Sequence, residues 1–113
     1  MSGVAGLYNV PTTAEELATW SALHARHHAD INREVAQKTG VDLPAYILDP
    51  FDPNNMQVWL DQHQDLHTRM DAVMSISGFN LDSVEWTDEN ERAGWVFLNG
   101  QEHYTAAAIL GIG

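Results

Sequence analysis

The stretch WLDQHQDLH, residues 59–67, places Trp59, His63 and His67 at intervals of four residues. Because an α-helix turns once in about 3.6 residues, this spacing puts the three side chains on one helical face, about one turn apart. The sequence therefore predicts an amphipathic helix whose core-facing stripe contains two imidazoles. The apolar residues of the same stripe are Met56, Leu60, Met70, Val73 and Met74.

This spacing occurs three times along the chain. Residues 20–28 read WSALHARHH and residues 95–103 read WVFLNGQEH, so the shared pattern is W-x3-[HN]-x3-H. One copy can arise by chance, whereas three copies in register indicate a repeated structural unit. The tryptophans, Trp20, Trp59 and Trp95, are predicted core anchors. The six positions that follow them form a predicted polar core layer: His24, His28, His63, His67, Asn99 and His103.

Helix boundary signals surround each copy. The predicted start signals are Thr12 or Thr13, Asp52 with Pro53, and Thr87 or Asp88. The predicted end signals are Gly40, Gly78 and Gly111, and the first two continue similarly as GVDL and GFNL. We therefore expect helices over residues 13–39, 54–77 and 88–110.

The third helix contains Gly94 and the Asn99-Gly100 dipeptide, which weaken it. One explanation is a kink near Asn99. The other, which we favour because the Trp and His register continues through these positions, is the close approach of a neighbouring helix.

The connections bound the direction of the helices. A helix of 24 residues is about 36 Å long, whereas a nine-residue link over residues 79–87 reaches only about 30 Å. Helices two and three are therefore predicted to be antiparallel, and the polar layer, which lies near each helix centre, meets at mid-bundle in either direction. The Pro-rich first connection is expected to be an extended cover. Its predicted packing residues are Leu43, Tyr46, Ile47 and Leu48.

The expected fold is all-α: a three-helix bundle with quasi-repeated helices, an extended N-terminal arm over residues 1–12 and a bundle domain over residues 13–113. An apolar content of 44% in 113 residues is enough for one core. In the arm, Val4, Leu7 and Tyr8 are the apolar contacts, either with the bundle itself or with a neighbouring subunit. We expect them to form a partner-binding arm.

Composition excludes several classes of function. The chain has no cysteine, which excludes disulfides, thiolate metal sites and cysteine nucleophiles. Its 16 acidic and 5 basic residues give a net charge of -11, which would repel a phosphate backbone, so nucleic-acid binding is rejected. No long apolar run and no secretory signal occur, so no membrane association is expected and synthesis in the cytoplasm is the simplest fit. Catalytic motifs are lacking, and we expect no enzyme.

The histidines have two interpretations. We favour a buried hydrogen-bonded layer without metal or other cofactor, because neutral imidazoles both donate and accept. The alternative is a transition-metal site, since His residues at i and i+4 can ligate one ion such as Zn(II), Ni(II), Cu(II) or Fe. The Glu-x-x-His motifs of di-iron bundles are missing, and Glu102 is expected to point about 100° away from His103. His27 is expected to be a partly exposed helical residue.

Four segments resemble a family of small proteins encoded by tailed bacteriophages and prophages: LATWSALHARHHADI, GVDLPAYILDP, WLDQHQDLHTRMDAV and VFLNGQEHYTAAAILGI. They cover most of the chain from Leu17 onward. The resemblance implies a role in the virion or in its morphogenesis, with a core layer and no catalytic residues. The family-like positions are Trp20, His28, Trp59, His63, His67, Trp95, Asn99 and His103.

We therefore expect a non-enzymatic structural protein of a tailed-phage virion, either associated with the capsid or part of the neck or tail. It would act by binding other virion proteins in a symmetric assembly. The first alternative is a transition-metal-binding bundle that uses the paired His-x3-His motifs. A third hypothesis is a regulator that binds a host protein through an acidic face.

Overall fold

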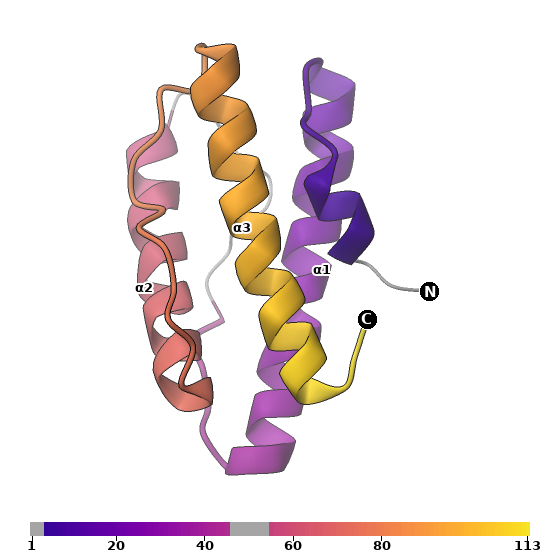
Figure 1. The fold of residues 1–113 in the computed structure, drawn as a ribbon, viewed down its shortest axis with the longest axis vertical. Helices are drawn as coiled ribbons and strands as arrows, with labels where there is room; N and C mark the ends of the chain where they lie inside the picture. The colour runs from indigo at the N-terminus through magenta and orange to yellow at the C-terminus, as the bar shows by residue number, and fades with distance from the viewer. Residues whose placement is uncertain (1–3, 46–54) are drawn as a thin grey trace.

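The computed structural model describes residues 4–45 and 55–113, and its regular structure is helical throughout (Figure 1). A short 3-10 helix, η1 (Val4–Tyr8), precedes three α-helices: α1 (Ala14–Thr39), α2 (Met56–Met74) and α3 (Glu89–Leu110). The prediction of an all-α three-helix bundle with an N-terminal arm is confirmed. Among the described residues, no helix is both long enough and apolar enough to cross a membrane.

Two helices begin at the predicted caps. The Thr13 hydroxyl accepts a hydrogen bond from Glu16 N at 3.1 Å, which caps α1. Asp88 caps α3 by accepting hydrogen bonds from Asn90 N at 2.9 Å and Glu91 N at 3.2 Å. These bonds satisfy amide groups that have no partner within the helix. The start predicted for the second helix at Asp52 and Pro53 lies outside the described residues.

The helix ends differ from the prediction at one place. Gly40 and Gly111 end α1 and α3 with φ of 77° and 72°, the left-handed conformation that glycine adopts most readily. In α2, however, Ser75 takes this conformation with φ of 55°, so the helix ends at Met74 rather than near Gly78. The connection that follows α2 is therefore longer than predicted.

All three helices are parallel, which corrects the predicted antiparallel pair. Figure 1 shows α1, α2 and α3 starting at the same end of the bundle. The tryptophan rings agree, since Trp95 lies 5.9 Å from both Trp20 and Trp59 between ring centroids. The prediction failed because residues 75–88 span about 46 Å when extended, more than the roughly 28 Å length of a 19-residue helix.

The second connection returns along α2 and α3. Phe79 N donates a hydrogen bond to Glu102, in the second half of α3, at 2.9 Å, whereas Asp82 O accepts one from Gln57 near the start of α2, at 3.3 Å. Leu81, between them, is completely buried. The first connection resembles it where it is described: Leu43 is buried, and Pro44 O accepts a hydrogen bond from Asn32. Tyr46, Ile47 and Leu48 lie outside the described residues.

The N-terminal arm packs on its own bundle. Leu7 is completely buried, and its carbonyl accepts a 3.1 Å hydrogen bond from Trp20 Nε1. In the same way, Leu81 O accepts one from Trp95 Nε1 at 3.0 Å. The arm therefore packs against both α1 and α3, just as the second connection packs against both α2 and α3. Val4 is also buried, so Val4 and Leu7 are not available to a partner, contrary to expectation.

Tyr8, the third residue predicted for the partner-binding arm, explains why α3 has a glycine at position 100. Helix α3 continues through Gly94 and Gly100 without a break. A Cβ atom added at Gly100 would lie 2.9 Å from Cε1 of Tyr8, and the Tyr8 hydroxyl donates a hydrogen bond to Gln101 at 2.5 Å. The close approach is therefore made by the aromatic ring of Tyr8 in η1 and not by the backbone of a neighbouring α-helix. Nothing lies within 4 Å of a Cβ added at Gly94.

Candidate metal centre

The parallel register brings the first polar position of each helix into one layer. His24 Nε2 lies 3.2 Å from His63 Nε2 and 3.4 Å from Asn99 Oδ1. All three side chains are completely buried. The layer therefore presents two nitrogens and one oxygen, one from each helix, to the axis of the bundle.

One turn further along, the second polar positions form a similar layer. His28 Nε2 lies 3.2 Å from His67 Nε2 and 3.1 Å from His103 Nε2. His28 is 3% exposed, and His67 and His103 are completely buried. Counting both layers, the ligand atoms of five histidines lie within 4.8 Å of one another. The six residues predicted to share a core layer therefore converge from three helices on one point.

The tryptophans cover one end of this centre. Trp20 stacks on His24 with ring centroids 4.6 Å apart and planes 13° apart. Trp59 stacks on His63 with nearly the same geometry, 4.7 Å and 15°. All three tryptophans of the repeat are buried, as core anchors would be. The aromatic layer separates the imidazoles from solvent at the end where the helices begin.

Glu102 extends the centre outward, and the sequence did not reveal this. It points away from the axis, as expected, but toward α2, where its Oε1 lies 3.1 Å from His67 Nδ1. Its other oxygen accepts the hydrogen bond from Phe79 N, and the side chain is only 1% exposed. A carboxylate on the outer nitrogen of a histidine fixes the tautomer that leaves Nε2 as a lone pair.

His27 is a second outer residue that the sequence misplaced. It was expected to be partly exposed, but it is buried, and its Nδ1 lies 2.7 Å from His103 Nδ1. The contact arises because α3 packs beside the face of α1 that carries His27. His27 therefore orients His103 from outside the two layers.

Four imidazoles of the centre are held neutral by their surroundings. Burial lowers the pKa of His24, His28, His63 and His103 well below the usual value of 6.5, and the neighbouring imidazoles lower it further. A charged imidazole in this position would lose its hydration and face other positive charges. Neutral imidazole is also the form that ligates metals.

Six atoms face the axis of the bundle: Nε2 of the five histidines and Oδ1 of Asn99. These inward atoms cannot all be paired with one another by hydrogen bonds, because each short contact between two of them has room for only one proton. When His67 ligates a metal as a neutral imidazole, its proton lies on Nδ1, which faces Glu102 Oε1, and its Nε2 is a lone pair. The contact between His28 and His103 can hold one proton, and so can the contact between His24 and His63. With all five imidazoles neutral, at most two of the six inward atoms therefore carry hydrogen, and at least four are lone pairs that face one another. A cation at their centre would satisfy all of them.

A second carboxyl group lies next to Glu102. Burial, and then the neighbouring Glu102, raise the pKa of Asp71 to about 8. For Glu102, burial acts to raise the pKa, but hydrogen bonds from His67 and Asp71 outweigh it and lower the pKa. The pair therefore holds one proton, on Asp71, and one negative charge, on Glu102. That charge lies directly beside an imidazole of the centre.

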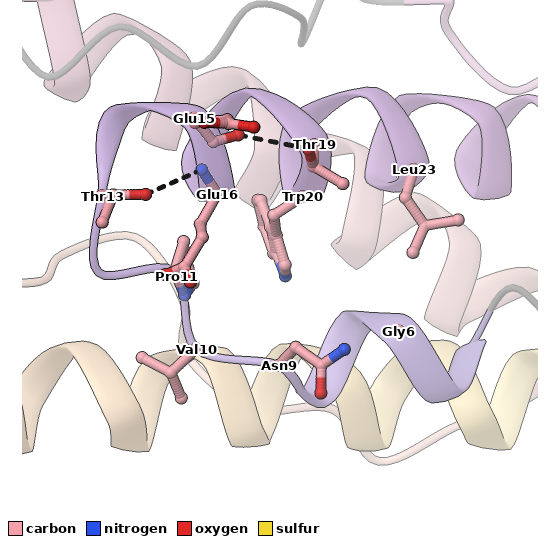
Figure 2. Close-up of a pocket in the computed structure, with 10 residues that line it drawn as sticks. All are labelled: Gly6, Asn9, Val10, Pro11, Thr13, Glu15, Glu16, Thr19, Trp20 and Leu23. Carbon is pink, nitrogen blue, oxygen red and sulfur yellow. Dashed lines mark hydrogen bonds between the residues drawn. The ribbon is translucent and has the colours of Figure 1, made fainter.

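A groove also lies between the N-terminal segment and the start of α1 (Figure 2). Of its two acidic residues, Glu15 and Glu16, the second accepts hydrogen bonds from the amide and the hydroxyl of Thr12, both at 2.8 Å, and thus helps to begin α1. Trp20 lines the groove and stacks on His24, so it forms the wall between the groove and the centre. We assign the groove no chemistry.

Comparison of the chain with protein-family models, with curated protein sequences and with solved structures found no match in any of the three. The geometry of the centre is therefore the basis of the proposal that follows.

Proposed function

We propose that this protein binds one transition-metal ion between its three helices. The observation that carries the proposal is the convergence of five buried imidazoles, from α1, α2 and α3, within 4.8 Å. Each helix contributes at least one of them. A bound ion would join three segments that are far apart in the sequence.

The spacing of the inward atoms supports this proposal. Metal–nitrogen bonds of about 2.1 Å place neighbouring ligand atoms about 3.0 Å apart in an octahedron and about 3.4 Å apart in a tetrahedron. Four of the separations within the two layers are 3.1 to 3.4 Å, and the ligand atoms of all five histidines lie within 4.8 Å of one another. Little movement of the side chains is needed to bring them around an ion. The hydrogen bond between His67 and Glu102 supplies the outer contact that metal-ligating histidines commonly have.

The role we propose for the metal is structural and not catalytic. Catalytic metal sites keep a position open for water or substrate, whereas structural sites are closed. Here every ligand side chain is at most 3% exposed, and tryptophans cover one end. The ion would stabilise the parallel arrangement of the helices, and the protein would act without catalysis.

The test is elemental analysis of untagged protein, purified without metal-affinity resin, together with a thermal melt with and without chelator. We expect about one metal ion per chain and a lower melting temperature in chelator. The variant His63→Ala removes a ligand and should lose most of the metal, whereas Val58→Ala, at an exposed position of the same helix, should keep it. Metal-free protein whose melting temperature is unchanged by chelator would contradict metal binding and support a hydrogen-bonded layer without metal.

A second proposal concerns the partner. We propose that this protein, with its helices joined by a metal ion, is a structural protein of a tailed-phage virion, as the family resemblance implies. Support comes from Phe97 and Tyr104, which are 52% and 56% exposed and lie two turns apart on one face of α3. Exposed aromatic side chains of this kind are frequent in protein interfaces. Detection of the chain in purified phage particles, and its loss in a Phe97→Ser, Tyr104→Ser double variant that still folds, is the test.

A further inference from the structure

We infer that the centre is six-coordinate, with Asn99 Oδ1 as the sixth ligand beside the five imidazoles, and that it selects metals that accept octahedral coordination, such as Fe(II), Ni(II) or Co(II). This inference rests on the proposed function and specifies its ligand set. It predicts that Zn(II), which prefers four ligands in structural sites, is a poorer fit.

The arrangement of the ligands carries the argument. Three parallel helices in register place three ligand atoms in each layer, one from each helix. The two layers are one helical turn apart, and imidazoles of adjacent layers lie close together, with ring centroids 4.5 Å apart for His24 and His28 and 4.1 Å apart for His63 and His67. Two stacked triangles of ligand atoms around one axis enclose a six-coordinate site. A tetrahedral ion would leave two of the six atoms without a bond.

Asn99 completes the first triangle. It occupies the position that His24 and His63 hold on the other helices, and it is completely buried. Its Oδ1 faces His24 Nε2 at 3.4 Å, and the same side chain is within hydrogen-bonding reach of His63. Its Nδ2 has no hydrogen-bond partner among the described residues. The amide therefore gains its contacts through the oxygen, the atom that can ligate a metal.

Charge is consistent with this ligand set. Five neutral imidazoles and one amide oxygen bring no negative charge to a divalent ion. Glu102, hydrogen-bonded to His67, places one carboxylate immediately outside the ligands. Asp71 beside it keeps its proton, so a second full charge is not added. A low-charge set of nitrogen ligands suits Fe(II) and Ni(II), whereas hard cations such as Mg²⁺ and Ca²⁺ require oxygen ligands.

Visible absorption of the full chain loaded with Co(II) tests the inference, because six-coordinate Co(II) absorbs weakly and four-coordinate Co(II) absorbs strongly. We expect weak bands for the natural chain. Asn99→Ala should strengthen and shift the bands and weaken Co(II) binding at least tenfold, a loss no smaller than that seen when an outer hydrogen-bond partner is removed. Asn99→His, which supplies a sixth imidazole, should restore weak bands and tight binding.

Asn32→Ala is the matched control, because Asn32 lies one turn beyond His28 on α1 and bonds to Pro44 O rather than to the centre. It should leave the Co(II) spectrum unchanged. Intense four-coordinate bands in the natural chain, or an identical spectrum in Asn99→Ala, would overturn the six-ligand centre and leave metal binding intact. Failure of the natural chain to bind Co(II), Ni(II), Fe(II) or Zn(II) would overturn both proposals.

Discussion

The aromatic layer and the imidazole layers lie on the same faces of the same helices, yet they are stabilised differently. In the aromatic layer, Trp20 and Trp95 donate their indole protons to Leu7 O and Leu81 O, outside the axis, and the rings pack against one another. In the imidazole layers, the polar atoms point inward, where protons are too few for them. In the first layer these two indole donors are satisfied within the protein, whereas the other layers gain from a cation.

Acid gives the largest expected difference between the layers. In metal-free protein, the lowered pKa values of four histidines mean that the unfolded chain binds more protons than the folded chain below about pH 6.5. The free energy of unfolding therefore falls as pH falls through 6.5, by up to about 1.4 kcal/mol per histidine per pH unit. Urea unfolding between pH 7.5 and 5.5 measures the slope.

Asp71 provides the control for this slope. Its pKa is raised in the folded chain, so between about pH 4 and pH 8 the folded chain binds the extra proton and Asp71 contributes stability that is lost as pH rises. Asp71→Asn removes this opposing contribution, and the loss of stability in acid should become steeper. A flat profile in the natural chain and in this variant alike would mean that the imidazoles are hydrated.

Removal of one indole should disrupt the aromatic layer whether or not metal is bound. Trp95→Ala deletes a buried side chain that contacts both other tryptophans of the layer, and we expect a loss of about 3 to 5 kcal/mol. The same loss is expected with and without chelator. Ile109→Ala, at an exposed position of the same helix, should change stability by less than about 0.5 kcal/mol. Equal losses for the two variants would contradict the packing of this layer.

Removal of one imidazole should give a smaller effect that depends on metal. In metal-free protein, His63→Ala leaves polar neighbours without a partner, and we expect a loss of roughly 1 to 3 kcal/mol in denaturant unfolding. In metal-loaded protein the loss should be larger, because binding stabilises only the folded chain. A loss near zero in both states would place His63 in solvent and refute the register of α2.

The smallest expected effect concerns the carboxyl pair outside the layers. A Cβ atom at Gly78 would lie 2.0 Å from Asp71 Oδ2 and 3.0 Å from Glu102 Oε1. Gly78→Ala should therefore displace both side chains and cost about 1 to 2 kcal/mol. Gly94→Ala, with nothing within 4 Å of the added atom, should instead stabilise α3 by up to about 1 kcal/mol. Thermal melts of the two variants, with opposite shifts, test this contrast.

The repeat W-x3-[HN]-x3-H was sufficient to predict three helices and the residues that meet at their centre, because both depend on spacing within one helix. The predicted direction of the third helix relative to the second was wrong, because it depended on where α2 ends. Gly78 carries the usual signal for a helix end, whereas Ser75, which takes the left-handed conformation, carries none. The predicted second helix ran three residues too far, to residue 77 instead of Met74. The predicted link was therefore too short to reach back to the other end of the bundle, which is why an antiparallel helix was expected.

Glu102 and His27 show a second limit of the sequence. Their positions on their own helices are correctly given by periodicity, and both point away from the axis as expected. Their contacts, however, come from neighbouring helices, so they depend on how the helices are rotated relative to one another. No spacing within the chain encodes that rotation. The available signal was that Glu102 and His27 are sequence neighbours of the predicted core residues His103 and His28.

The hydrogen bond from Val4 N to Gly113 O, at 3.2 Å, has a topological consequence. It brings the arm that covers α1 to the end of α3, so the path of the chain closes into a ring of three helix-and-return units. Such a ring has three equivalent places at which it could be opened, and a circular permutant cut within either connection would keep every layer. Three separate copies of the first or second unit, arranged as a homotrimer, would place six imidazoles around a true threefold axis.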